Sequence, residues 1–154
     1  MAISIVNVTE EYIEDIFKIE QSEIIVPWSK NSLTDLIRQQ NIIFRVMLKD
    51  DEVIGYYSFQ KIFDEGYINN IAIKREYQSQ GYGTQLFEDL IERAQKFEVN
   101  ALTLEVEVKN EKAIGLYKKF GFKEEGIRKD FYLNSLDALI MWRRSSLIAW
   151  SVHI

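Results

Sequence analysis

The chain has 154 residues, a formal net charge of −5, no cysteine and one histidine, His153, next to the last position. A chain of this length is expected to form one domain. Without cysteine it has no disulfide, thiolate metal site or cysteine nucleophile. Because it also has only one histidine, we expect no metal site. The acidic balance disfavours nucleic acid as a partner, the lack of an apolar run near ~20 residues disfavours a membrane span, and the lack of a signal sequence favours a cytoplasmic protein.

The first quarter of the chain predicts one strand and two helices. Residues 3–8 alternate apolar and polar side chains, as a strand does, and Thr9 is placed to cap a helix after it. A second helix follows a cap at Ser29 or Ser32. The helices leave a loop at 21–28, whose apolar side chains either line a binding groove or fold back onto the core.

The next segment predicts antiparallel strands. Residues 42–49 and 53–60 form a hairpin across a short acidic turn, and Gly55 marks a bulge. Residues 61–66 are expected to be a loop, and residues 67–73 form the next strand.

A strand–helix–strand unit follows. The strand 67–73 leads into a helix at about 83–97 and then into a strand at 101–107. We expect these two strands to lie parallel, with a right-handed crossover. Gly81 and Gly83 fall in the turn before the helix, where free N–H groups and the positive end of the helix dipole favour a phosphate.

The last part predicts one short helix and two strands. Asn110 opens a helix over 111–120 that Gly121 ends, and strands follow at about 122–130 and 136–143. The whole order predicts an α+β, or mixed α/β three-layer, fold with a single domain over residues 1–154 and one central sheet flanked by helices.

The glycine turn does not fit the two commonest phosphate-binding loops. A nucleotide-hydrolysing P-loop needs a lysine directly after its second glycine, but Gly83 is followed by Thr84. A dinucleotide-binding loop needs a third glycine where this chain has Leu86. The pattern that remains is Gln-x-x-Gly-x-Gly, from Gln78 to Gly83.

Several motifs together resemble one family. The glycine turn, residues 70–73, residues 104–106 and the segment 110–122 look like the GNAT superfamily of acetyl-CoA-dependent N-acetyltransferases. Within it the motifs Pro27-Trp28-Ser29, Glu65 and Asp137-Ala138-Leu139-Ile140-Met141 resemble the bacterial ribosomal-protein-alanine N-acetyltransferases. The resemblance covers about residues 3–141. Residues 142–154 are a C-terminal extension that either pairs with a sheet edge or covers a groove, or has no role in the fold.

The resemblance implies a central mixed, splayed sheet with acetyl-CoA between two parting strands. The pantetheine arm would pair with the strand end, and the pyrophosphate would meet the N–H groups of the glycine turn. The cofactor-binding residues implied are Ile71, Ala72, Ile73, Gln78, Ser79, Gln80, Gly81, Tyr82, Gly83, Thr84 and Asn110.

The resemblance also implies two catalytic residues. Transfer from a thioester to an amine needs a neutral amine, a stabilised oxyanion and a protonated leaving thiolate. Glu105 is the implied general base, acting directly or through water, and Tyr117 the implied general acid, because a phenol with a pKa near 10 can protonate a departing thiolate. A backbone N–H near Ile71 or Ile73 is the expected oxyanion donor.

The function implied is acetylation of a protein N-terminal α-amine, that of alanine on a small-subunit ribosomal protein. Alternatives are acetylation of a small amine or polyamine, and a non-catalytic acyl-CoA-binding module, against which the presence of both Glu105 and Tyr117 argues. We expect a monomer or weak dimer whose partners are acetyl-CoA and a protein N-terminus.

Overall fold

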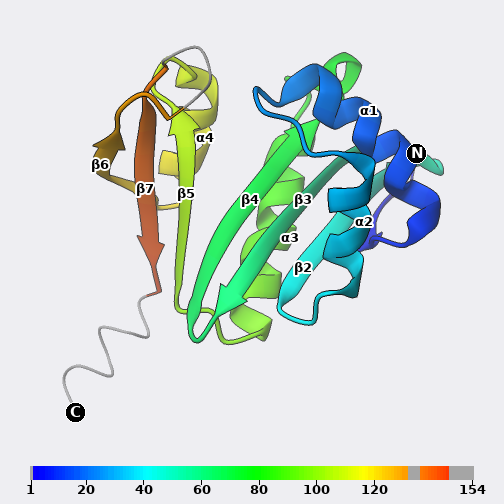
Figure 1. Cartoon of the computed structure of the whole chain (residues 1–154), viewed down its shortest axis with the longest axis horizontal. Helices are drawn as coiled ribbons and strands as arrows, with labels where there is room; N and C mark the ends of the chain where they lie inside the picture. The colour runs from blue at the N-terminus through cyan, green and yellow to red at the C-terminus, as the bar shows by residue number, and fades with distance from the viewer. Residues whose placement is uncertain (1, 132–135, 146–154) are drawn as a thin grey trace.

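The computed structural model describes residues 2–131 and 136–145, and in these residues seven strands form one mixed sheet in the order β1-β2-β3-β4-β5-β7-β6 (Figure 1). The strands are β1 (Ile3–Asn7), β2 (Ile42–Lys49), β3 (Glu52–Ile62), β4 (Glu65–Ile73), β5 (Ala101–Glu107), β6 (Lys123–Arg128) and β7 (Ala138–Arg144). The helices are α1 (Ile13–Glu23), α2 (Lys30–Arg38), α3 (Tyr82–Lys96) and α4 (Glu111–Lys119), with short 3-10 turns at Glu10–Tyr12 and Arg75–Tyr77. Residues 146–154, most of the expected extension, lie outside the described part.

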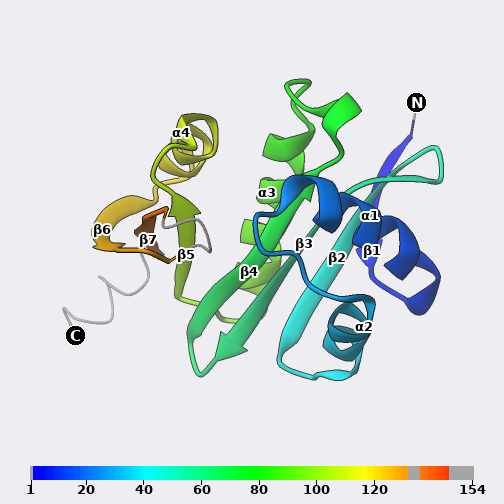
Figure 2. The ribbon, with the colours of Figure 1, turned by 45° about the horizontal axis from the view of Figure 1, so that its top comes forward.

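Helices cover both faces of the sheet, which confirms the three-layer prediction. α1 and α2 lie on one face and α3 and α4 on the other (Figures 1 and 2). The alternation of β2 explains this arrangement, because Val46 and Leu48 pack in the α1–α2 core while Met47 packs in the α3–α4 core. No helix in the described residues is long and apolar enough to cross a membrane.

The parallel strands β4 and β5 are paired over only part of their length. Their register runs from Glu65 opposite Ala101 to Tyr67 opposite Thr103. Just beyond, the pairing of β3 with β4 passes from Phe59–Ile68 to Ser58–Asn70, which leaves Asn69 as an extra residue. Such a bulge bends a strand, and it coincides with the point where β4 leaves β5. Figure 2 shows the two strands diverging above it.

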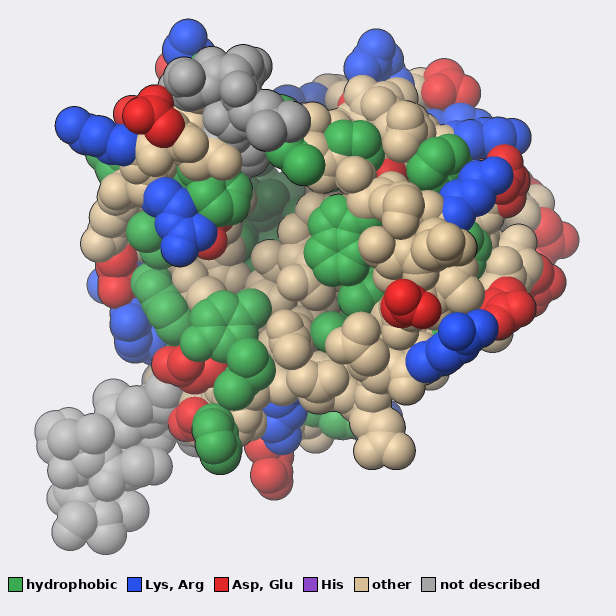
Figure 3. Space-filling view, viewed as in Figure 1, with side chains coloured by type: hydrophobic (Ala, Val, Ile, Leu, Met, Phe, Trp, Pro, Cys, Tyr) green, Lys and Arg blue, Asp and Glu red, His purple; other side chains and the backbone are tan. Residues whose placement is uncertain are grey.

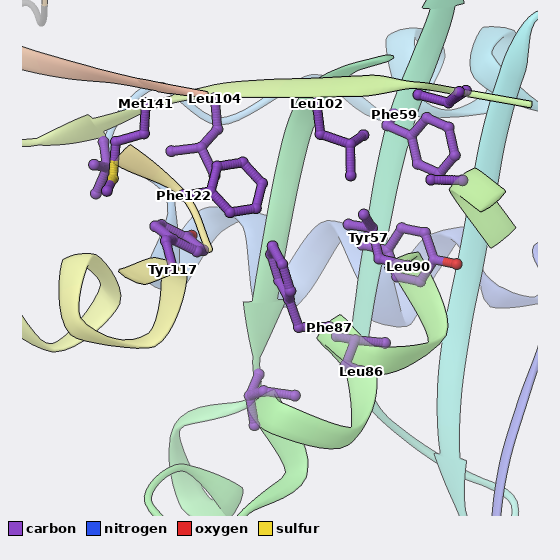
Figure 4. Packing of buried hydrophobic residues seen from close by; sticks show 14 of the residues in the cluster. Tyr57, Phe59, Leu86, Phe87, Leu90, Leu102, Leu104, Tyr117, Phe122 and Met141 are labelled. Carbon is purple, nitrogen blue, oxygen red and sulfur yellow. The ribbon is translucent and has the colours of Figure 1, made fainter. Parts of the chain in front are cut away.

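Aromatic side chains fill part of the space between the diverging strands. Phe87 of α3 packs against Tyr117 of α4, with ring centroids 5.4 Å apart, and against Phe122, with centroids 5.6 Å apart (Figure 4). Phe87 is fully buried. These rings join α3, α4 and the two halves of the sheet in one core, so the split sheet is held together on the α3–α4 side.

The structure corrects the bounds of two predicted loops. The expected loop at 61–66 is wrong, because β3 runs to Ile62 and β4 starts at Glu65, so only two residues turn the chain. The turn contains neither glycine nor proline; Phe63 itself adopts a positive φ of 55°. The expected loop at 21–28 is shorter, since α1 continues to Glu23.

The predicted helix start at Thr9 is also corrected, whereas the second cap is confirmed. Thr9 precedes a 3-10 turn and makes no side-chain cap, and the α-helix itself begins at Ile13. Ser29 caps α2 by accepting a hydrogen bond from the Ser32 N–H at 3.1 Å. The predicted bulge near Gly55 is present, because Gly55 faces Met47 and Val53 faces Leu48, leaving Ile54 as the extra residue.

Candidate active site

A cavity of about 630 Å³ lies between the glycine turn, α4 and the free end of β4, which is the part beyond Tyr67 that is not paired with β5. Figure 3 shows the surface hollowed between the β5–β7 half and the rest of the molecule. Most of the predicted site residues line this cavity: Ile71, Ala72, Ile73, Gln78, Ser79, Gly81, Gly83, Thr84, Asn110 and Tyr117. The other three, Gln80, Tyr82 and Glu105, do not line it.

Two helix N-termini face this cavity. α3 follows Gly81, which adopts a φ of 90° and provides no side chain to cap the helix. α4 is capped by Asn110, whose Oδ1 accepts from the Ala113 N–H at 3.2 Å. Each N-terminus presents the positive end of a helix dipole. The cavity therefore favours an anion although the protein is acidic overall.

Gly81 and Gly83 serve the turn in different ways. The positive φ of Gly81 is a conformation that other residues adopt only at a cost. Gly83 has no such φ, and a Cβ built on it would lie 3.9 Å from Ile73 and Leu116 side-chain atoms, which is ordinary contact. The fold itself therefore does not require glycine at position 83.

A lysine adds positive charge that the sequence did not reveal. Lys112, in the first turn of α4, lines the cavity, and its Nζ donates a hydrogen bond to the Ser79 hydroxyl. The contact spans 33 positions of the sequence, so no local pattern predicts it. Lys119 lines the same cavity, and Glu23 is the one acidic residue among its described lining residues.

Gln78 links the glycine turn to its surroundings. Its Nε2 donates to the Ile73 carbonyl at 2.9 Å and to the Glu23 carboxylate at 2.7 Å. Ile73 is the last residue of β4 and Glu23 the last of α1. Gln78 therefore fixes the turn to the free strand end. Gln80 and Tyr82 are directed elsewhere: the Gln80 amide bonds the Glu76 carbonyl, and the Tyr82 ring contacts Tyr77.

Tyr117 joins the core to the cavity. Its ring packs against Phe87 and Phe122, and the residue as a whole is 8% exposed while lining the cavity. A buried tyrosine can combine an apolar ring contact with a polar hydroxyl aimed at a site. The position is compatible with proton donation to a ligand in the cavity.

Glu105 lies on the opposite face of β5. The alternation of the strand places Leu104 in the α3–α4 core and the exposed Glu105 on the other face. At β5 none of the helices in the described residues covers that face (Figure 1). The Arg128 Nη1 of β6 donates to both Glu105 carboxylate oxygens, at 3.0 and 3.3 Å. The Arg128 guanidinium also lies over the Phe131 ring, 5.0 Å from its centroid.

Glu20, a buried carboxylate near the point where β4 leaves β5, is not among the residues predicted from the sequence as functional. Glu20 of α1 is fully buried, and it accepts hydrogen bonds from the Tyr56 hydroxyl, the Asn70 amide at 2.6 Å and the Trp28 N–H at 3.0 Å. Burial raises the pKa of Glu20, and the three hydrogen bonds offset this only in part. Glu20 thus ties the α1–α2 loop to the bulged part of β4.

No group of three or more His, Cys, Asp or Glu among the described residues is arranged to hold a metal ion.

Comparison with known proteins matches residues 13–122 to the acetyltransferase (GNAT) family. The ribosomal protein bS18-alanine N-acetyltransferase of Escherichia coli strain K12 is 34% identical over 128 residues, covering 81% of this chain and 86% of the relative. A Bacillus subtilis strain 168 protein is 41% identical over 138 residues, covering 88% and 91%, and its name assigns it the same activity provisionally.

A solved structure has the same fold. The crystal structure of the ribosomal-protein-S18-alanine N-acetyltransferase from Escherichia coli superposes with a TM-score of 0.86 at 29% identity, covering 93% of this chain and 94% of that one. The family match includes the glycine turn and the strands on either side of the split.

Proposed function

The chain belongs to the GNAT family of acetyltransferases, and we propose that it transfers the acetyl group of acetyl-CoA to the N-terminal α-amine of a protein, the alanine of ribosomal protein bS18. The acetyltransferase class follows from the family. The donor, the acceptor and the residue roles are our proposal.

The observation that carries the proposal is the cavity with two helix N-termini beside the end of β4, which is paired with β3 but not with β5. The pyrophosphate of acetyl-CoA would accept hydrogen bonds from the uncapped first turn of α3, next to the Lys112 ammonium. The pantetheine arm would pair with Ile71–Ile73, the part of β4 that has no pairing with β5. Both contacts use backbone groups, so they need no surplus of basic side chains.

The two faces of the split sheet give donor and acceptor separate approaches. The cavity, with Tyr117, lies mainly beside α3 and α4 and also reaches the end of α1 at Glu23, whereas Glu105 lies on the opposite face of β5. A donor entering from one side and an amine from the other would meet in the gap where β4 leaves β5. This geometry supports direct transfer from thioester to amine.

The proposed reaction balances without a covalent enzyme intermediate. The neutral amine nitrogen attacks the thioester carbon, the C–S bond breaks, and the proton lost by nitrogen passes to Glu105 directly or through water. Tyr117 gives its proton to the leaving sulfur, and a backbone N–H of β4 stabilises the oxyanion. An α-amine has a pKa near 8 and is about one-tenth neutral at pH 7, so a modest base is enough.

The acceptor is proposed from the relatives named for bS18 alanine. The face that carries Glu105 is compatible with a peptide, because Ile25 and Val26 of the α1–α2 loop and Phe131 beyond β6 are exposed apolar side chains. A ribosomal protein is made in the cytoplasm, and we propose that the reaction takes place there.

The test is release of CoA thiol with three acceptors: a peptide beginning with the N-terminal alanine of bS18, the same peptide with a blocked α-amine and an added lysine, and spermidine. We expect turnover with the first alone. Turnover with spermidine alone would favour a polyamine acetyltransferase. No turnover with any acceptor, although acetyl-CoA binds, would favour a binding module.

A further inference from the structure

A second cavity, of about 320 Å³, lies at the opposite end of the sheet from the site described above. It is enclosed by the start of β2, the end of β3 and the last turns of α2 and α3, at the lower end of the sheet in Figure 1. At the ~30 Å³ that a water molecule occupies in the liquid it has room for roughly ten waters. It shares no lining residue with the first cavity.

The charges around this cavity are unbalanced. Arg45, Lys61 and Arg93 line it, and none of its described lining residues is acidic. The Asp89 carboxylate, which does not line the cavity, accepts from the Arg45 Nε at 3.2 Å and from the Tyr57 hydroxyl at 2.6 Å. One partly buried carboxylate therefore forms ion pairs with two arginines, Arg45 and Arg93.

Among the three cations that line the cavity, Arg93 is the one for which the described residues offer no hydrogen-bonding partner. Its side chain is 25% exposed, its Nε is buried and makes no hydrogen bond in the described structure, and the Asp89 carboxylate lies 3.9 Å from it. By contrast Arg45 is satisfied by Asn7, by the Ile5 carbonyl and by Asp89. A buried donor left unsatisfied costs free energy, and a guanidinium offers five donors in a fork that matches a carboxylate.

Asn7, Gln40 and Asn41 add three polar side chains to the lining, and the other lining residues are apolar. Val8, Leu36 and Phe44 are buried there, and Ile37, Ile42, Ile43 and the half-exposed Phe97 make up the rest of the apolar part of the walls. Lys61 donates to the Phe97 carbonyl at 2.6 Å, which satisfies a main-chain oxygen at the end of α3 that would otherwise repel an anion. A wholly polar anion would leave these walls in contact with water, whereas an apolar tail would cover them.

We propose that this cavity binds a small monocarboxylate with an apolar body, its carboxylate on Arg93 and its body against the aliphatic and aromatic walls. The site is separate from the acetyl-CoA cavity and goes beyond the proposed acetyl transfer. A ligand here should leave the affinity for acetyl-CoA unchanged, because no lining residue is common to both cavities.

Hexanoate, hexanamide and inorganic phosphate separate the contribution of the negative charge from that of the apolar body. Titration of the full-length protein followed by NMR should give saturable binding of hexanoate with a Kd in the millimolar range, as expected for so small a ligand. Hexanamide keeps the body without the charge, and phosphate keeps the charge without the body. Each should bind at least about tenfold more weakly.

The matched variants are Arg93→Gln and Lys96→Gln, which remove the same charge from the same turn of α3. Lys96 is exposed and does not line the cavity. Arg93→Gln should weaken hexanoate binding at least about tenfold, and Lys96→Gln should leave it unchanged. In the wild type, which needs no variant to fold, the Nε–H resonance of Arg93 should shift on titration.

Three results would overturn the proposal: no saturable hexanoate binding up to tens of millimolar, equal affinity for hexanoate and hexanamide, or equal affinity of the wild type and a folded Arg93→Gln. Competition between hexanoate and acetyl-CoA would also overturn it, because it would place the ligand in the other cavity.

Discussion

Gly83→Ala separates the stability of the glycine turn from its function. The added methyl lies 3.9 Å from its nearest neighbours, and Gly83 has no positive φ, so the substitution introduces neither a clash nor strain. Alanine is favoured over glycine by about 0.8–1 kcal/mol inside a helix, and at the second residue of α3 we expect about half of this. For a chain of this size the melting temperature should rise by about 1–2 °C.

The same methyl projects from the first turn of α3, where we place the pyrophosphate. Loss of charge-assisted hydrogen bonds to the phosphate, at about 1.5–3 kcal/mol, corresponds to about a 10- to 150-fold rise in the Kd of acetyl-CoA. Isothermal titration with acetyl-CoA and a thermal melt of the same sample measure both quantities.

Gly115→Ala is the control. Gly115 also lies in a helix, lines the same cavity and has no atom within 4 Å of a built Cβ, but it lies in the middle of α4 rather than at a free N-terminus. The Gly115→Ala variant should be more stable than the wild type and should keep most of the affinity for acetyl-CoA. Wild-type affinity in Gly83→Ala, or an equal loss in both variants, would refute the assignment of the phosphate to these N–H groups.

Four further substitutions test the remaining parts of the account. Tyr117→Phe should lower kcat by about 100-fold or more while the Kd of acetyl-CoA stays within about threefold; a matching loss of binding in titration would make the residue structural. Glu105→Gln should lower kcat/KM, and the loss should shrink as pH rises towards 9, because an α-amine with a pKa near 8 then needs no base; a pH-independent loss in the pH–rate profile would count against a base. Burial raises the pKa of Glu20 above its usual 4.5, so its protonated form stabilises the fold below that pH and this stabilisation is lost as pH rises through the raised pKa. In urea unfolding, the free energy of unfolding of the wild type should therefore fall relative to that of Glu20→Gln as the pH is raised from 4 to 8. A difference between the two proteins that does not change with pH would contradict the burial argument. Gly81→Ala should cost about 1–2 kcal/mol through its φ of 90° alone, since no atom lies within 4 Å of a built Cβ, and unchanged unfolding would exclude strain there.

The parts of the fold that follow from local chemistry were predictable. The strand 101–107 shows its alternation in seven residues, and the Asn110 cap and the turn at Gly121, with a φ of 88°, depend on neighbours within one turn of helix. The turn at 63–64 was missed because a two-residue turn at Phe63 carries no glycine or proline signal.

The parts that depend on distant residues were not predictable. Glu20 accepts hydrogen bonds from Tyr56 and Asn70, which are 36 and 50 positions away in the sequence. These contacts allow a glutamate, which is usually exposed, to lie in the core. The position of Lys112 beside the glycine turn likewise depends on how α4 packs, which its own sequence does not encode.

The most direct test of the central claim is tandem mass spectrometry of unacetylated bS18 after incubation with this protein and acetyl-CoA. The account predicts one added acetyl group, located on the α-nitrogen of the N-terminal alanine, with Tyr117→Phe forming it far more slowly. Acetyl groups found on lysine side chains, or an unmodified bS18 in the presence of active enzyme, would contradict it.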